Sequence, residues 1–256
     1  MAVDPIHQFE IHNVFPITQI GTAQIHLTNS AIFMAISVGL TMLLLLGTTG
    51  SRRLVPTRMQ SVAELTYELM ANTLRNVTGD EGMKFFPFVF SLFMFILFAN
   101  LIGLIPYGFT VTSHLIITAA LALLVFFTVI IYGFWKNGLA WLKLFVPSGI
   151  PTFMIPLIVV IELLSFFSRP ISHSVRLFAN MLAGHITLKL VAGFIAMLGG
   201  VGFVGWLGAI APLALTVALT ALEFLVAALQ AFVFAILTCI YLNDAIHPSH
   251  DPHPAH

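Results

Sequence analysis

Six of the ionisable side chains in the second half of the sequence lie within its two long apolar segments, 151–198 and 206–242, where a charge is costly. They are Glu162, Arg169, Arg176, His185, Lys189 and Glu223. At the centre of a membrane-spanning helix an Arg, Lys or Asp costs about 2.5 to 3.5 kcal/mol, so such residues usually face a polar cavity and belong to an ion pathway. The chemistry that this set suggests is therefore proton or ion transfer.

The spacing of these residues follows helix faces. Glu162, Arg169 and Arg176 are seven residues apart, which is nearly two helical turns and keeps them on one slowly drifting face. Glu223 and Gln230 are also seven apart on a second apolar segment. Two polar stripes on neighbouring helices could line one pathway.

A hairpin register brings the two stripes together. In two antiparallel helices, facing residues have position numbers that sum to twice the number at the centre of the turn. Arg176 with Gln230 sums to 406 and His185 with Glu223 to 408, which places the centre at 203 to 204. That position falls among the glycines at 199, 200, 202 and 205. The sequence therefore predicts Gln230 beside Arg176 and Glu223 beside His185.

Side-chain chemistry assigns a role to each group. Arg176 stays protonated at any accessible pH, so it can act only as a fixed positive charge. His185 and Glu223 can both take up and release protons, and a coupled acid and imidazole is what a proton relay needs. Glu162, at the opposite end of its stripe, could serve a second aqueous access.

Three of the charges also have purely structural explanations. Arg169 and Lys189 could extend towards the headgroup region of a membrane. Glu162 could form a structural ion pair with an arginine. No acid lies one turn from Arg176, which disfavours a purely structural role for that residue.

The composition of the chain is typical of a protein embedded in a lipid bilayer. Of the 256 residues 59% are hydrophobic and 8% are charged, too few charges for a water-soluble surface. The formal net charge is zero, so the sequence does not indicate a basic surface that would bind nucleic acid.

Three spans are expected before the two polar stripes, each about as long as a bilayer crossing of ~20 residues. We expect these spans at 30–46, 84–105 and 113–135, with an external segment 1–28 and cytoplasmic loops 51–83 and 136–150. The loops are placed by the Arg and Lys residues at their ends, because such residues concentrate on the cytoplasmic side.

The first loop also predicts a helix. Thr57 and Gln60 match a capping box, and Val62, Leu65 and Leu69 follow at helical spacing. This helix could lie at the membrane interface or against a partner, or it could be a solvated loop helix.

The remaining apolar sequence forms two segments, 151–198 and 206–242, that are too long to stand upright. As single helices their apolar stretches 153–198 and 212–242 would be about 69 Å and 46 Å long, against a hydrocarbon core of about 30 Å. The sequence therefore predicts an all-α polytopic membrane protein with about five crossings, the last two forming a long, strongly tilted hairpin, and a cytoplasmic tail at 243–256.

The polar stripes carry a family resemblance. SRPISHSVRLFANMLAGH at 168–185, followed by EFLVAALQAFVFAILTCIYL at 223–242, resembles subunit a of the F-type ATP synthase membrane sector. The resemblance runs from FANLIGLIPY at 98–107 to the end of the chain, and the R-L-x-x-N-x-x-A-G block is its most specific part.

The resemblance implies two offset half-channels against a rotating ring of c subunits. In that family an essential arginine, matched by Arg176, separates the half-channels and releases the proton from the carboxylate of the ring. Asn180 and Gln230 match polar residues near that arginine, and Glu162 matches an acid on the cytoplasmic exit side.

The other half-channel is matched by His185 and Glu223. Their order, His and then Glu, resembles mitochondrial and alphaproteobacterial members, whereas other members have Glu and then His. Gly103 stands where some bacterial relatives have an acid, which makes the outer path more dependent on His185, Glu223 and His114.

The resemblance also implies the setting of the chain. It would be a non-catalytic, proton-translocating component, with the c-subunit ring, the b-type subunits of the peripheral stalk, other ATP synthase subunits and the lipid bilayer as partners. A bacterial inner (plasma) membrane is the expected location, with the mitochondrial inner membrane as the alternative. No cofactor, metal or nucleic acid is expected.

Two other functions would each account for part of the sequence. A proton-coupled secondary transporter usually has two inverted repeats with broken helices in matching places. In this chain the set of ionisable residues within apolar helix lies in one half only, and the first three spans are nearly devoid of such residues. A membrane metalloenzyme is suggested by His247, His250, His253 and His256. The prolines between these histidines forbid a regular helix and favour a solvated tail.

Overall fold

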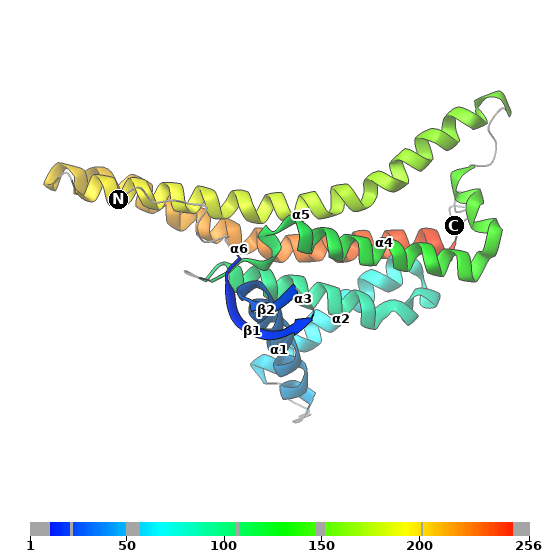
Figure 1. Ribbon diagram of the computed structural model, residues 1–256, viewed down its shortest axis with the longest axis horizontal. Helices are drawn as coiled ribbons and strands as arrows, with labels where there is room; N and C mark the ends of the chain where they lie inside the picture. Colours follow the sequence, from blue (N-terminus) through cyan, green and yellow to red (C-terminus); the bar gives the residue numbers. More distant parts are fainter. Residues whose placement is uncertain are drawn as a thin grey trace. The chain divides into compact units, whose positions relative to one another are not determined.

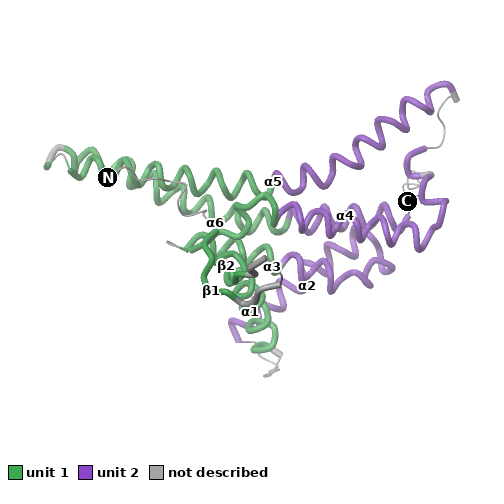
Figure 2. The backbone as a smooth tube through the Cα atoms, in the orientation of Figure 1, with its two compact units in different colours: residues 1–52, 94–117, 176–232 green, residues 53–93, 118–175, 233–256 purple. Residues whose placement is uncertain are grey.

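The computed structural model describes residues 11–20, 23–49, 57–105, 108–146, 152–200 and 202–247, and these are mainly helical (Figure 1). The chain divides into two compact units (Figure 2). Unit 1 consists of 1–52, 94–117 and 176–232, and unit 2 of 53–93, 118–175 and 233–256. The two long C-terminal helices each contribute to both units.

Five of the described helices are long and apolar enough to cross a membrane. Three of them are α1 (Asn29–Thr49), α3 (Phe86–Gly103) and α4 (Leu115–Asn137). The other two, α5 (Ile155–Gly199) and α6 (Phe203–Ile246), form the C-terminal hairpin. The predicted fold class, an all-α membrane protein with five hydrophobic crossings ending in a long hairpin, is confirmed.

The C-terminal hairpin turns where the glycines lie. Gly202 has φ +88°, a left-handed conformation that only glycine adopts readily, and its carbonyl accepts a hydrogen bond from Trp206 in the first turn of α6. α5 and α6 contain 45 and 44 residues, so each would be about 66 Å or more in length as a regular helix. α6 thus begins earlier and ends later than the 206–242 segment expected from hydropathy.

A two-stranded sheet in unit 1 was not predicted. β1 (Asn13–Ile20) pairs antiparallel with β2 (Ala23–Thr28), with shifts of register on both sides of Pro16. Proline cannot donate to a ladder, so an irregular register at this position is expected. Ala31 then donates its backbone N–H to the hydroxyl of Thr28, which caps the start of α1 directly after the strand.

The predicted loop helix is present in unit 2 as α2 (Arg58–Thr78). Thr57 is its N-cap and accepts from the backbone N–H of Gln60 at 3.4 Å. The side-chain amide of Gln60 donates to Glu64 at 2.7 Å, so the cap forms without the reciprocal half of the capping box. Met70 and Leu74 are buried.

The apolar stripe predicted on α2 stays exposed. Val62, Leu65 and Leu69 are 52%, 65% and 48% exposed. An exposed apolar face fits the expectation of an interfacial or partner-facing helix, which remains a prediction.

Each unit has its own apolar core. In unit 1, Ala99 from α3 packs with Phe109 and Val111 from the following segment, and Phe33 of α1 packs against them. In unit 2, Trp141 and Phe145 pack with Phe166 of α5.

Candidate functional site

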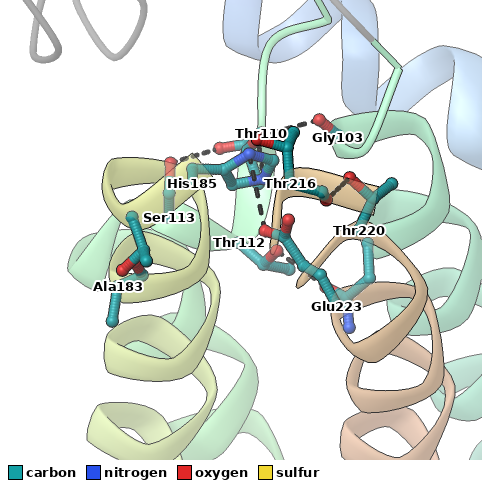
Figure 3. Close-up of polar contacts among 11 residues, drawn as sticks. Gly103, Thr110, Thr112, Ser113, Ala183, His185, Thr216, Thr220 and Glu223 are labelled. Carbon is teal, nitrogen blue, oxygen red and sulfur yellow. Dashed lines mark hydrogen bonds and ion pairs between the residues drawn. The ribbon is translucent and has the colours of Figure 1, made fainter. Parts of the chain in front are cut away.

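The centre of the candidate site is a buried acid and imidazole pair in unit 1. His185 extends from α5 and Glu223 from α6, and the two side chains point towards one another (Figure 3). The distance from His185 Nδ1 to Glu223 Oε1 is 3.6 Å, and both residues are only 6% exposed. The two residues are therefore neighbours, as the hairpin register predicts, while their role in proton transfer stays a prediction.

The carboxylate of Glu223 is buried but has little polar support. Among the described residues neither of its oxygens has a hydrogen-bond partner, since 3.6 Å lies beyond hydrogen-bond distance. A buried polar group without a hydrogen bond is costly, and an ionisable group inside a membrane helix usually marks a functional path. The arrangement costs stability, which is typical of a group retained for function.

Gly184 makes the approach of Glu223 possible. A Cβ atom at Gly184 would lie 2.6 Å from Glu223 Oε1, closer than real Cβ contacts. Only a residue without a side chain lets the carboxylate come this close to the backbone of α5. The glycine in the A-G-H sequence therefore shapes the site directly.

A short polar segment covers the other side of the histidine. Thr110 Oγ1 lies 3.0 Å from His185 Nε2 and donates to the carbonyl of Gly103 at 3.4 Å. Ser113 in turn donates its hydroxyl to the carbonyl of Thr110 at 2.7 Å. Thr110 therefore connects the end of α3 to the imidazole on α5.

Asn100 joins this segment to α6. Its amide donates to the carbonyl of Ala227 at 3.1 Å, and its side-chain oxygen accepts from Thr112 at 2.7 Å. Asn100, Thr110 and Thr112 are fully buried. The site thus depends on four parts of unit 1: α3, the segment after it, α5 and α6.

These supporting residues were missed by the sequence reading. Asn100 was seen only as the end of a span, and Thr110 and Thr112 lie in a loop between spans. The available signal was the run TVTSH at 110–114, which is polar between two apolar helices.

His114 closes this run and belongs to the expected outer path. Its ring stacks on Phe109 with centroids 4.9 Å apart and planes 18° apart. The residue lies between α3 and α4, and burial lowers the pKa of its imidazole below the usual 6.5. His114 is therefore predominantly neutral at pH 7.

Arg176 and Asn180 lie one turn apart on an exposed face of α5 in unit 1, together with Ala179 and Ala183. Gln230 of α6 is buried, and its side-chain oxygen accepts from Asn180 at 3.3 Å. The register predicts Gln230 beside Arg176, whereas the hydrogen bond forms one turn further along α5. The long side chain of glutamine allows such a shift along the helix.

The remaining charges lie in unit 2, apart from Lys189, which is half-buried in unit 1. Glu162 is half-buried on α5. Arg169 pairs with Asp244 of α6 at 2.6 Å and lies over the rings of Phe166 and Tyr241. Arg169 is therefore held by a partner that the sequence reading missed, because Asp244 follows the apolar run.

No group of three or more His, Cys, Asp or Glu suited to a metal ion occurs within the residues that the structure describes. Of the four tail histidines, the structure describes His247. Its Nδ1 lies 3.2 Å from Asn243 Oδ1. His250, His253 and His256 lie outside the described residues.

Comparison with known proteins gives consistent matches. The family model described as ATP synthase A chain matches residues 31–243. A relative from Nitrobacter winogradskyi, named ATP synthase subunit a, is 66% identical over 97% of this chain and 100% of its own length. Relatives with the same name from Afipia carboxidovorans and Rhodopseudomonas palustris are each 64% identical, over 96% and 98% of this chain and 99% and 100% of their own lengths.

Proposed function

Since the chain belongs to the ATP synthase A chain family, we propose that it is the proton-translocating stator subunit of a rotary ATP synthase. It is a multi-pass protein of a bacterial membrane and takes part in ATP synthesis and proton transport as a component of the membrane sector. The chain itself carries out no bond chemistry. It forms two offset half-channels against a ring of c subunits, and Arg176 keeps the half-channels apart.

The observation that carries this proposal is the position of Arg176 on an exposed face of the hairpin. Ala179, Asn180 and Ala183 share the exposed face with it. A permanently charged side chain facing hydrocarbon would be costly, whereas small neighbours let another helix approach closely. This combination fits a partner helix that brings a carboxylate past the guanidinium.

His185 and Glu223 form the inner end of the outer half-channel. In contrast to the exposed Arg176, they are buried, and they lie 3.6 Å apart. A proton taken up by one group can move to the other and from there to the carboxylate of the ring. The fixed charge of Arg176 repels a proton that would continue along α5, so the proton must travel with the ring.

Glu162 serves the second half-channel, on the cytoplasmic side. It is the one acid of α5 and lies fourteen residues before Arg176 in the sequence. Its half-buried side chain can exchange protons with water. Asn180 and Gln230 act as polar neighbours of the arginine.

The proposal includes the setting. The chain would work in the bacterial inner membrane with the c ring, the b-type subunits of the peripheral stalk and other subunits of the complex. The secondary-transporter alternative gains no support, because α1 and α3 contain no ionisable residue that could form a matching second half.

The deciding experiment replaces Arg176. In membrane vesicles that contain the complete complex, Arg176→Ala should abolish ATP-driven quinacrine quenching while the subunit still inserts and assembles. Arg75→Ala is the matched control, because this arginine lies on the exposed surface of α2 with its side chain 58% exposed. Normal coupling in Arg176→Ala would refute the proposal, and equal losses in both variants would point to a general defect of assembly.

A further inference from the structure

The hydroxyl of Thr110 lies within hydrogen-bond distance of two groups but has one hydrogen to donate. It lies 3.4 Å from the carbonyl of Gly103 and 3.0 Å from His185 Nε2. A threonine hydroxyl has one hydrogen to donate and two lone pairs to accept with. Which of the two neighbours receives that hydrogen decides which nitrogen of His185 carries its own.

The carbonyl of Gly103 is the group that accepts the hydroxyl hydrogen of Thr110. Gly103 is the last residue of α3 and is buried, and the final carbonyls of a helix have no partner inside the helix. Three described backbone N–H groups that follow it bond to other carbonyls: Leu104 to Asn100 and Leu101, Ile105 to Ile102 and Gly108 to Ile105. A carbonyl can only accept, whereas an imidazole nitrogen can donate or accept.

Once Thr110 donates to Gly103, it can only accept from His185. Nε2 must then carry a hydrogen, and in the neutral imidazole Nδ1 has the free lone pair. Nδ1 is the atom that lies 3.6 Å from Glu223 Oε1. The exchangeable site of the histidine is therefore directed at the acid.

We propose that Thr110 is a positioning residue that holds His185 as the Nε2–H tautomer, so that Nδ1 is the nitrogen that gains and loses the proton opposite Glu223. The inference rests on the proposed function, because it assigns the atom through which that proton path runs. In the transfer step the O–H bond of the Glu223 carboxylic acid breaks and an N–H bond forms at Nδ1. A carboxylate and an imidazolium result, and the reverse step restores the neutral pair.

Two contacts hold Thr110 in place for this task. A Cβ atom at Gly103 would lie 2.7 Å from Thr110 Cγ2 and 2.9 Å from its Oγ1, so the glycine provides the space that the threonine occupies. Ser113 holds the backbone of Thr110 by donating to its carbonyl. The glycine at 103 therefore has a function of its own, namely to admit the residue that orients the imidazole.

The tautomer can be observed directly. We would label histidine with ¹⁵N in the assembled complex in native membranes and assign His185 by its loss in His185→Gln. The native spectrum should show Nε2 bearing hydrogen and Nδ1 with a free lone pair. Thr110→Ser should keep that pattern, and Thr110→Val, which has the same shape but no hydroxyl, should lose it.

Proton conduction supplies the functional half of the test. In vesicles stripped of the catalytic sector, Thr110→Val should conduct protons about tenfold more slowly, the expected size for one lost hydrogen bond to an ionisable group. Thr110→Ser should restore conduction to within about twofold. Thr128→Val is the matched control, because this half-buried threonine of α4 donates its hydroxyl within its own helix, to the carbonyl of Leu124.

The outcomes separate the inference from the proposed function. A native spectrum with hydrogen on Nδ1 overturns the inference, whatever the conduction. Unchanged conduction in Thr110→Val, while His185→Ala abolishes it, overturns the positioning role and leaves the proposed function intact. Unchanged conduction in His185→Ala overturns the outer half-channel itself, and the spectrum still decides the tautomer.

Discussion

The two units treat their buried charges in opposite ways. In unit 2, Arg169 and Asp244 meet at 2.6 Å, and the guanidinium also lies 5.5 and 5.2 Å from the ring centroids of Phe166 and Tyr241. In unit 1, His185 and Glu223 are more deeply buried but stay 3.6 Å apart. In the first pair each charge has a partner, whereas the carboxylate of the second pair accepts no hydrogen bond from the part of the chain that the structure describes.

From this difference we predict that the first pair is structural and that the second exchanges protons. A short ion pair between arginine and aspartate fixes two helices to each other. An acid and an imidazole at a longer distance can share one proton in either of two states. Substitutions at His185 and Glu223 should therefore affect proton conduction first, and substitutions at Arg169 and Asp244 should affect stability first.

The largest effect is expected from the acid and imidazole pair. His185→Glu or Glu223→His alone should reduce proton conduction roughly a hundredfold or more, the usual scale for loss of a proton-transferring group. The combined exchange restores one acid and one imidazole and should conduct better than either single variant. Conduction is measured in vesicles stripped of the catalytic sector, and equal damage in all three variants would contradict the pairing.

A smaller but clear loss is expected when the approach of the acid is blocked. Gly184→Ala places a Cβ 2.6 Å from Glu223 Oε1, and the carboxylate must move away from the imidazole. Because a displacement of about 1 Å can cost a hundredfold in a transfer step, we expect a loss of roughly ten- to a hundredfold in proton conduction. The thermal stability of the complex should change little.

The same helix offers the control for this variant. Gly193 has no atom within 4 Å of the position of a Cβ, so Gly193→Ala should conduct like the native protein. A loss of equal size in both variants would mean that replacing either glycine of α5 impairs conduction, and the specific role of Gly184 would be wrong.

Some contacts in the two units could be predicted from the sequence, and others could not. The pairing of His185 with Glu223 followed from the spacing on two helices and the glycine turn, because antiparallel helices impose one register. Asn100, Thr110 and Thr112 did not follow, because their contacts join segments that no periodicity relates. Asp244 was missed for another reason: α6 continues beyond its apolar run, and hydropathy alone placed the helix end too early.

In unit 2 the largest effect should be on stability. Asp244→Asn leaves Arg169 half-buried without its counterion and should destabilise the subunit by about 1 to 3 kcal/mol. We expect heat-induced loss of the assembled complex, followed on native gels, at a lower temperature, with proton conduction at 25 °C nearly unchanged. A double-mutant cycle with Arg169→Gln isolates the pair, and coupling near zero would contradict the structural role.

The exposed pair of Arg75 and Asp80 calibrates that cycle. Its side chains are 58% and 90% exposed at a distance of 3.2 Å, so solvent screens the interaction. The same cycle on Arg75→Gln and Asp80→Asn should give no measurable coupling. A coupling as large as that of Arg169 and Asp244 would mean that burial is not the cause of the strong interaction between Arg169 and Asp244.

The smallest effect is expected at the end of α6. Lys136 of α4 donates to the backbone carbonyl of Ile246 at 3.2 Å and to Glu81 at 2.6 Å, and Asn137 next to it donates to the carbonyl of Ala245 at 2.8 Å. These donors satisfy carbonyls that the helix end leaves without a partner. Because Asn137 remains, Lys136→Gln should lower the temperature of complex loss by less than half of the shift in Asp244→Asn. Lys136→Gln combined with Asn137→Ala removes both donors and should lower it further, whereas an unchanged temperature in the combined variant would show that these contacts do not hold the end of α6 to α4.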